Sequence, residues 1–451
     1  MPDLLQLNRG QFFALGWRAW MAASGLVTLA VVGRSLSPTE QGYYFTFESL
    51  INLRVVAELG LSQVIVQVAS HQLARLGWTP DGLLDGDGPA RERLAKLLRE
   101  GLRWYAWVGA TLGVLLAAGG HLFFRSGSPT DVAWALPWLA LSAVTAAHFL
   151  VLPLMALLEG LGQVAQVMRL RLLDALVSYV LLWFALKHGA GLWALPFFYL
   201  SSLIIQASWL TVRRRHVLRE IWRAHERSYE DFWRREVLPF QWRLGVSWLS
   251  GYLVFHLLTP LVFLLAGPVD AGRIGMSLVA AQGVLTIGIS VMRANAPTLG
   301  RLIAAQDWPH LGRVWRRTLQ QTLAITALGS VMIPLLGLAL EAYLPAFAQR
   351  VLPSQLLAVL AVATVINGAT QATAVYLRAY REEPLMWASV GVAALSVPLN
   401  LLAIRFLGPA GTCLAFLLVA SLNCLWTVRV LVQRNASRAA LQLVVEGAPA
   451  A

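Results

Sequence analysis

Apolar runs of about 20 residues recur along the whole chain, and no other feature constrains its fold as much. A helix rises about 1.5 Å per residue, so a run of this length crosses the roughly 30 Å hydrocarbon core of a bilayer. The runs are continuous instead of alternating over about ten residues, which argues against a transmembrane barrel. Only 13% of the residues are charged, against about 25% in soluble domains. The sequence therefore predicts an all-α polytopic membrane protein.

Twelve candidate transmembrane spans follow from these runs. They cover residues 11–35, 42–70, 102–124, 132–157, 164–187, 191–212, 240–265, 272–296, 317–340, 354–379, 384–405 and 410–431. The first run is longer than the apolar core of a signal peptide, which has about 7–15 residues, so we expect it to be retained. The spans that end near residues 35, 265 and 405 are followed almost at once by the next span, which predicts short turns.

Basic residues set the expected orientation, because Lys and Arg collect on the cytoplasmic side of membrane proteins. The formal net charge is +13. With the N-terminus inside, the outer side carries few cations: Arg34, Arg125, Lys187, Arg273, Arg350 and Arg405. The inner loops carry most of the others. Both termini are therefore predicted to be cytoplasmic.

Two inner segments, 89–103 and 213–237, have helical periodicity. The second has arginines around an apolar stripe, which is typical of a helix lying on the anionic inner leaflet. This stripe consists of Leu218, Ile221, Trp222, His225, Tyr229, Phe232 and Trp233. A nucleic-acid-binding patch is the competing interpretation, but no other feature supports a nucleic-acid partner. Because the segment lies at the midpoint of the chain, we expect it to connect two halves.

The same corner occurs twice, 230 positions apart. Pro38-Thr39-Glu40-Gln41-Gly42 joins the first two predicted spans, and Pro268-Val269-Asp270-Ala271-Gly272 joins the seventh and eighth. In each corner Pro fixes the turn, the acid can cap the next helix, and Gly permits close approach of backbones. A second match, at an offset of 219, pairs Thr145, His148, Leu152, Met155 and Glu159 with Thr364, Asn367, Gln371, Ala374 and Arg378.

The internal repeat predicts two six-helix lobes. An even number of spans returns the chain to the same side, so the lobes would be related by a pseudo-twofold axis along the membrane normal. We expect a first lobe over 1–212, a cytoplasmic amphipathic connector over 213–237, a second lobe over 238–435 and a cytoplasmic tail over 436–451.

Polar side chains line one face of several predicted spans, and such residues at membrane depth usually face a cavity or a partner. The second span is the most polar, with Glu48, Asn52, Arg54, Glu58, Ser62, Gln63 and Gln67. In it, Arg54 can reach Glu58 at i+4, and Gly60 allows a bend. The fourth, fifth, eighth and tenth spans contribute His148, Asp174, Gln282, Thr286, Ser290, Arg293, Thr364, Asn367, Gln371 and Arg378. Together these faces predict one hydrated interior.

Simpler interpretations of these residues stay open. Arg18, in the first span, can extend its guanidinium to the inner interface while its methylene groups stay in apolar surroundings. Arg293 and Arg378 lie near inner helix ends, where the preference for internal positive charge accounts for an arginine by itself. Arg54 and Glu58 can form an ion pair that is only structural. A polar face shared by several spans is harder to explain in this way.

Motifs of catalysis and cofactor binding are missing from the sequence. It contains no P-loop G-x-x-x-x-G-K-[ST], no H-E-x-x-H and no G-x-S-x-G. Cys413 and Cys424 are the only cysteines and lie in one apolar run, so we expect neither a disulfide nor a metal site. We expect no enzymatic activity and no cofactor. Any transport would use an ion gradient (H⁺ and Na⁺ both stay open), the membrane potential or the substrate's own gradient.

The sequence resembles a known family in its two sets of six spans and in three short motifs. L-S-P-T-E-Q-G-Y-Y at 36–44, E-L-G-L-S at 58–62 and P-F-Q-W-R at 239–243 are similar to the polysaccharide (O-antigen, Wzx-type) flippase branch of the multidrug/oligosaccharidyl-lipid/polysaccharide exporter superfamily. The resemblance implies two lobes in a V around a cationic cavity in a bacterial inner membrane. It also implies that an undecaprenyl-diphosphate-linked oligosaccharide, used in lipopolysaccharide synthesis, moves to the outer leaflet by alternating access.

The resemblance also implies which residues bind the substrate. Its cavity cations fall on Arg18, Arg54 and Arg293, and Arg suits a diphosphate because it forms bidentate, charge-assisted hydrogen bonds. The full set of expected cavity residues is Arg18, Glu48, Asn52, Arg54, Glu58, Gln63, Gln282, Thr286, Arg293, Asn367, Gln371 and Arg378. The seventh span departs from the family's pattern, because its only cation, Arg243, lies at the inner end. The cavity is therefore expected to be less basic than in the lipid II flippases. Expected partners are the lipid-linked oligosaccharide, membrane lipids and other polysaccharide assembly proteins.

Three other functions stay open at this point. A cation-coupled multidrug exporter of the same superfamily predicts an acid deep in the first span, where this chain has Arg18 instead. A membrane polysaccharide polymerase or ligase predicts a large outer loop, whereas the outer loops here are short. A scaffold for an assembly complex predicts that the polar faces are dispensable.

Overall fold

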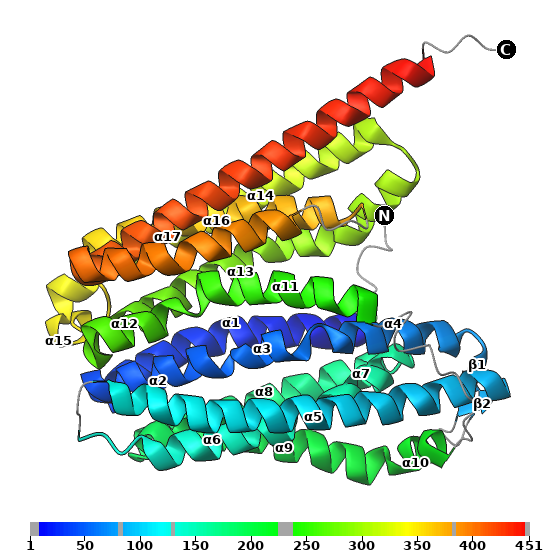
Figure 1. Ribbon diagram of the computed structural model, residues 1–451, viewed down its shortest axis with the longest axis horizontal. Coiled ribbons are helices and arrows are strands. Elements are labelled where there is room, and N and C mark those ends of the chain that lie inside the picture. The colour runs from blue at the N-terminus through cyan, green and yellow to red at the C-terminus, as the bar shows by residue number, and fades with distance from the viewer. Residues whose placement is uncertain (1–8, 80–83, 128–130, 224–237, 381–384, 447–451) are drawn as a thin grey trace. The chain divides into compact units, whose positions relative to one another are not determined.

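The computed structural model describes residues 9–79, 84–127, 131–223, 238–380 and 385–446 (Figure 1). Within these ranges the chain is almost entirely helical, as predicted. It divides into two compact units, residues 1–252 with 267–269 and residues 253–266 with 270–451. The predicted connector boundaries stay a prediction, because residues 224–237 lie outside the described ranges.

The first unit consists of helices and one small hairpin. Its helices are α1 (Arg9–Ser35), α2 (Pro38–Ile51), α3 (Leu53–Glu58), α4 (Leu61–Leu73), α5 (Gly88–Ser126), α6 (Ala135–His148), α7 (Leu152–Gly160), α8 (Val164–Lys187), α9 (Ala194–Arg213) and α10 (Arg215–Arg223), and α11 (Leu238–Phe255) begins in it. The antiparallel strands β1 (Leu76–Trp78) and β2 (Leu84–Gly86), which the sequence analysis missed, form the hairpin. Helix α8 packs between α1 and α9, and α6 packs on α5 and α9.

The second unit is built on long helices. They are α12 (Leu258–Ala266), α13 (Pro268–Ala304), α14 (Trp308–Tyr343), the short α15 (Pro345–Ala348), α16 (Ser354–Arg378) and α17 (Met386–Glu446). Helix α16 packs between α14 and α17. Inside α17, Gly408 has non-helical backbone angles with φ 60°, and it separates the predicted spans 384–405 and 410–431.

In the described ranges, nine helices are long and apolar enough to cross a membrane, and the bent pair Pro38–Glu58 with Leu61–Leu73 makes ten. The twelve predicted spans exceed this number for two reasons. Helix α17 contains two of them, and α8 carries charged residues that lower its hydropathy: Arg169, Arg171 and Asp174.

Two predicted spans are broken by proline. Pro153 lacks the N–H that would bond the carbonyl of Phe149, and the break between α6 and α7 lies there. Pro260 likewise cannot bond the carbonyl of His256, and α11 gives way to α12 at this point. The second repeat match therefore pairs a broken element, α6–α7, with the unbroken α16.

The two corners begin their helices in different ways. At the first, Ser37 Oγ accepts from the Glu40 backbone N–H at 3.2 Å, and the Glu40 carboxylate accepts from the Ser37 N–H at 2.8 Å. This reciprocal pair is a capping box. At the second, the Asp270 carboxylate accepts from Arg273 Nη1 at 3.2 Å. The expectation that the acid caps the helix is confirmed for Glu40.

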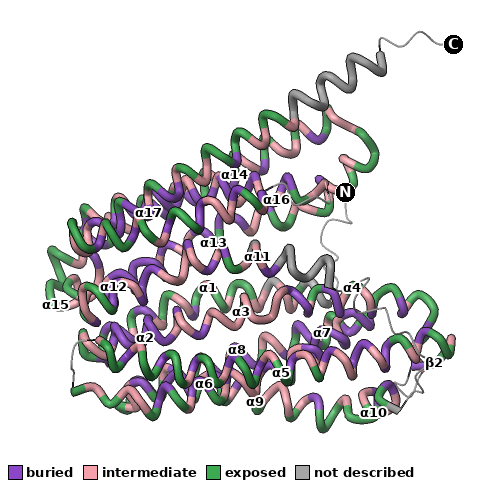
Figure 2. Tube along the Cα trace, in the orientation of Figure 1, coloured by how far each residue is buried: buried purple, intermediate pink, exposed green. Residues whose placement is uncertain are grey.

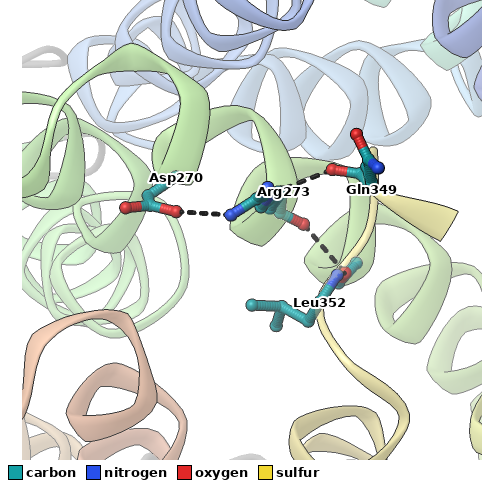
Figure 3. A network of polar contacts seen from close by, with 5 residues as sticks. Asp270, Arg273, Gln349 and Leu352 are labelled. Carbon is teal, nitrogen blue, oxygen red and sulfur yellow. Dashed lines mark hydrogen bonds and ion pairs between the residues drawn. The ribbon is translucent and has the colours of Figure 1, made fainter. Parts of the chain in front are cut away.

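Figure 3 shows what Arg273 does beyond this ion pair. Its Nε donates to the Gln349 carbonyl at 2.9 Å. One turn further along α13, Ser277 Oγ accepts from the Leu352 N–H at 3.2 Å. The start of α13 thereby holds the connection between α15 and α16.

Figure 2 colours the chain by burial. On α14 the residue types that are buried and exposed are the reverse of those on a soluble helix. A stripe at i+4 spacing is buried and consists of Thr318, Thr322, Thr326 and Ser330. Large apolar side chains such as Leu328, which is 71% exposed, cover the outer face. Small polar residues let membrane helices pack closely, while lipid solvates the apolar face.

Part of the predicted connector is described, namely α10. Val217 and Ile221 are each 4% exposed on this helix, which packs against the N-terminal part of α5. Trp222 is exposed, and Arg99 of α5 lies over its ring at 5.5 Å. The helix is confirmed, but Ile221 faces protein instead of lipid. The remaining stripe residues lie outside the described ranges: His225, Tyr229, Phe232 and Trp233.

Candidate functional site

The most polar predicted span is divided by two breaks. Helix α2 ends at Ile51, α3 runs for one and a half turns, and Leu59 and Gly60 then have left-handed φ angles of 51° and 71°. The helices on either side of this second break meet at 41°. The bend expected at Gly60 is confirmed. The break at Asn52, whose Nδ2 donates to the Glu48 carbonyl at 2.9 Å, was not predicted.

The spacing puts Arg54 within reach of Glu58, but the structure gives Glu58 other partners. The Glu58 carboxylate accepts from the Tyr105 hydroxyl of α5 at 3.1 Å and, in a short contact, from Ser62 Oγ. No ion pair joins it to Arg54 in the part of the chain that is described. The physical reason is packing, because α5 brings the Tyr105 hydroxyl to the carboxylate. Gln63, on the next turn, is exposed.

Arg54 occupies a different environment. Its Cζ lies 4.9 Å from the centroid of the Tyr199 ring of α9, a cation–π arrangement. The Tyr199 hydroxyl is 3.5 Å from the Glu48 carboxylate, and Glu48 is close enough to Arg54 to interact electrostatically. The guanidinium is half-buried, and none of its donors has a hydrogen-bond or ion-pair partner among the described residues. Two predicted site residues, Glu48 and Arg54, are thus brought together around a tyrosine.

Asp174 of α8 has three hydrogen-bond donors around its carboxylate. It is 7% exposed, and its carboxylate accepts from Ser178 Oγ at 3.1 Å, Ser202 Oγ at 2.8 Å and Gln206 Nε2 at 2.8 Å. Neutral donors at these distances can hold an ionised carboxylate without a countercharge. Intramembrane acids with such surroundings are used as proton or ion relays in transporters.

The second unit holds six of the predicted site residues. They are Gln282, Thr286 and Arg293 on α13, and Asn367, Gln371 and Arg378 on α16. Helix α13 is continuous, so its three residues share a face as predicted, and Thr286 Oγ1 donates to the Gln282 carbonyl at 2.8 Å. Asn367 is only 2% exposed, whereas Arg293 is exposed. That these residues and those of the first unit line one cavity stays a prediction.

Arg18 is exposed on α1. This exposure is compatible both with a cavity position and with a side chain that extends to the interface. Its role as a cavity cation therefore stays a prediction.

Several residues of the site were missed by sequence reasoning. The missed residues Ser202 and Gln206 stand four apart on α9, and the missed Ser178 stands four residues after Asp174 on α8, so i+4 polar pairs were the available signal. Nothing in the sequence identified Tyr199 as a site residue, because an aromatic residue in an apolar span also fits a lipid-facing position.

Metal ligands do not gather in the described part of the chain: no group of three or more His, Cys, Asp and Glu residues could hold an ion there. Cys413 and Cys424 are free thiols.

Comparison with known proteins gives a result for structures only. No protein-family model and no curated protein matches the chain. An inward-facing multidrug resistance MATE family transporter of the MOP superfamily is similar, with a TM-score of 0.65, 16% identity, and 97% of this chain and 98% of that chain covered. The lipid II flippase MurJ, in an inward closed conformation, is similar with a TM-score of 0.61, 13% identity, and 93% and 87% covered.

A MOP superfamily transporter from Pyrococcus furiosus is also similar, with a TM-score of 0.58, 17% identity, and 95% and 97% covered. Each likeness extends over nearly the whole chain at low identity. The chain is therefore a multi-pass helical membrane protein with the fold of the MOP superfamily transporters.

Proposed function

We propose that this protein is a flippase that carries an undecaprenyl-diphosphate-linked oligosaccharide from the inner to the outer leaflet of a bacterial inner membrane. The observation that supports this most is Arg54, a half-buried cation in a candidate span whose donors have no partner among the described residues. The Tyr199 ring and the nearby Glu48 carboxylate stabilise this cation, and its guanidinium donors are left to bind an anion that arrives with the substrate.

A diphosphate is the part of a lipid-linked sugar that resists crossing the bilayer. Arg54 offers a planar set of donors that matches phosphate oxygens, and the ring of Tyr199 supports its position. The half-buried hydroxyls and amides of the first unit suit the sugar, while the lipid tail can stay in the bilayer. The proposal includes cytoplasmic termini and contacts with other proteins of polysaccharide assembly, and it assigns no enzymatic role.

Cation-coupled export of small molecules is the second candidate function. Two acids favour it, because Asp174 is 7% exposed and Glu48 lies among tyrosines at membrane depth. A carboxylate in that position attracts a cationic drug or a coupling ion. The two candidates differ in which charge carries the substrate: Arg54 in the flippase and an acid in the exporter.

The test is leaflet exposure of labelled undecaprenyl-diphosphate oligosaccharide in proteoliposomes that contain the purified protein. Wild type should translocate the lipid, and Arg54→Gln should be slower by about 10–100-fold, as the loss of a charge-assisted hydrogen bond of about 1.5–3 kcal/mol requires. Arg54→Lys should keep part of the rate. Arg103→Gln, which removes an exposed cation of α5, is the matched control and should transport normally.

A cationic fluorescent dye serves as the competing substrate in the same vesicles. Dye transport that needs Asp174 but not Arg54, without lipid translocation, would favour the exporter. Normal lipid translocation by Arg54→Gln would show that a cationic binding site is not the mechanism.

A further inference from the structure

The short helix α10 begins where a candidate span ends. That span covers Gly191–Arg213, and α10 starts two residues later, at Arg215. A helix rises about 1.5 Å per residue, so all of α10 lies within about 15 Å of the end of the span. The headgroup layer on each side of the hydrocarbon core is about 5–7 Å thick. Helix α10 therefore starts at the level of the lipid headgroups.

The apolar face of α10 is already covered by protein. Val217 and Ile221, one turn apart, are each 4% exposed, and the helix packs on α5. The sequence analysis expected the stripe that contains Ile221 to face lipid. Because α5 covers this side, any contact of α10 with lipid has to use the opposite side of the helix.

Two arginines of α5 fix this orientation of α10. Arg91 Nη1 lies 3.8 Å from the carboxylate of Glu220, the only acid of α10. Its Nη2 lies 2.6 Å from the Asp85 carboxylate of the hairpin. At the end of α10, Arg99 donates to the Trp222 carbonyl in a short contact and lies over the Trp222 ring at 5.5 Å. The one negative charge of α10 is thereby turned toward α5.

The exposed side chains described on α10 are basic or aromatic, namely Arg215, His216, Arg219 and Trp222. Arg215 and Arg219 stand four residues apart and so share one face, which we call the cationic face. Neither arginine has an acidic partner among the described residues, and Arg215 Nε lies 3.4 Å from His216 Nε2. Helical side chains lean toward the N-terminus of their helix, which for α10 is the end at the span. Both guanidinium groups therefore lean back toward the headgroups.

We propose that the cationic face of α10, Arg215 with Arg219, is a docking surface for the headgroups of anionic phospholipids. Guanidinium groups bind phosphate oxygens through charge-assisted hydrogen bonds, and basic residues next to a span are attracted to an anionic leaflet. With the expected topology, this leaflet is the inner one. The inference goes beyond the proposed function and does not depend on it, because the ligand is the bulk lipid and not a transported substrate.

A soluble acidic protein is the competing occupant of a cationic helix face. The lean of both arginines toward the end of the span favours the lipid, since Arg219 lies six residues beyond Arg213, or about 9 Å along a helix axis. A long arginine side chain extends its charged end from such a position to the headgroup layer.

The test places a fluorescent probe between the two arginines. His216→Cys is labelled with bimane in the full-length protein, in which Cys413→Ala and Cys424→Ala remove the native thiols. The labelled protein is reconstituted in vesicles of phosphatidylcholine that contain a minor share of phosphatidylglycerol. A nitroxide near the start of an acyl chain, which quenches bimane at short range, is carried by one lipid or by the other. The ratio of quenching at equal shares of labelled lipid gives the enrichment of phosphatidylglycerol at the probe.

With both arginines present, phosphatidylglycerol should be enriched at the probe by about 5–30-fold, the range that one or two arginines near an anionic surface supply. Arg215→Gln combined with Arg219→Gln should reduce the enrichment to less than about 3-fold. The matched control is Arg313→Gln with Arg317→Gln, which removes the same charge at the same spacing from exposed positions of α14. It should leave the enrichment unchanged. Thermal unfolding checks that all variants are folded alike.

Four outcomes would overturn the proposal. Equal quenching by the two lipids would mean that the face touches lipid without selecting its charge. No quenching by either lipid would leave the face to water or to a soluble acidic protein. Enrichment that survives the loss of both arginines would place the lipid site elsewhere, and an equal loss in the α14 control would make it an effect of net charge. The vesicles contain no undecaprenyl lipid, so each outcome is independent of the flippase function.

Discussion

Two adjacent residues, Leu59 and Gly60, hold left-handed backbone angles in the middle of a candidate span. Gly adopts such angles freely, whereas a residue with a Cβ pays about 1–2 kcal/mol. Strain of this kind persists where the surroundings require it, and it is concentrated at sites that move or bind. Here it ends α3, the short helix that carries both Arg54 and Glu58.

The strain gives a prediction for the free energy of unfolding. Gly60→Ala should lower it by about 1 kcal/mol, and Leu59→Gly should leave it unchanged or raise it, because only the second change relieves a left-handed side chain. Thermal unfolding of the purified protein in detergent measures both. Gly283→Ala is the control, since a Cβ there meets no atom within 4 Å and the helix favours alanine. Equal destabilisation by both changes at the break would contradict the prediction.

The two corners with the same sequence motif are stabilised by different interactions. The corner before α2 closes a capping box between Ser37 and Glu40, whereas the corner before α13 relies on a half-exposed ion pair between Asp270 and Arg273. Ser37→Ala should therefore lower the unfolding free energy by about 1 kcal/mol. Asp270→Asn should cost less than about 0.5 kcal/mol, as exposed pairs do. The reverse order in thermal unfolding would argue against this account of the corners.

Helix α14 starts at a pH-sensitive cap. The side chain of Asp307 accepts from the His310 backbone N–H at 3.1 Å, and this bond, with the His310 ring, holds the pKa of Asp307 below its ordinary value. Its stabilising effect is complete above the unfolded value of about 3.9 and is lost as the pH falls through the lower folded value. Wild type should therefore lose more thermal stability than Asp307→Asn between pH 5 and pH 2. Parallel curves for the two proteins would refute this.

Across the whole molecule, the central prediction concerns two arginines in different units. If Arg54 and Arg293 bind the same diphosphate, each change to Gln slows lipid translocation, and the double variant is slowed less than the product of the two effects. Separate functions would give multiplicative losses. The measurement is the double-mutant cycle in proteoliposomes, with protein amount and thermal unfolding matched among the variants.

Much of the fold could be predicted because it follows from local chemistry. Long apolar runs must become helices in a bilayer, since each backbone group needs a partner within its own segment. The capping acid Glu40, the bend at Gly60 and the shared face of Gln282 and Arg293 depend only on spacing along one helix. These features were confirmed for that reason.

What the sequence by itself determined was therefore a helical membrane protein with polar faces, while the tertiary structure decided which polar groups meet. Spacing put Arg54 within reach of Glu58, but the Glu58 carboxylate accepts from Tyr105 of α5 instead. Asp174 accepts from Ser202 and Gln206 of α9, and Tyr199 of the same helix supports Arg54. The physical reason is that periodicity specifies which face a side chain occupies, whereas its partners depend on how separate helices pack.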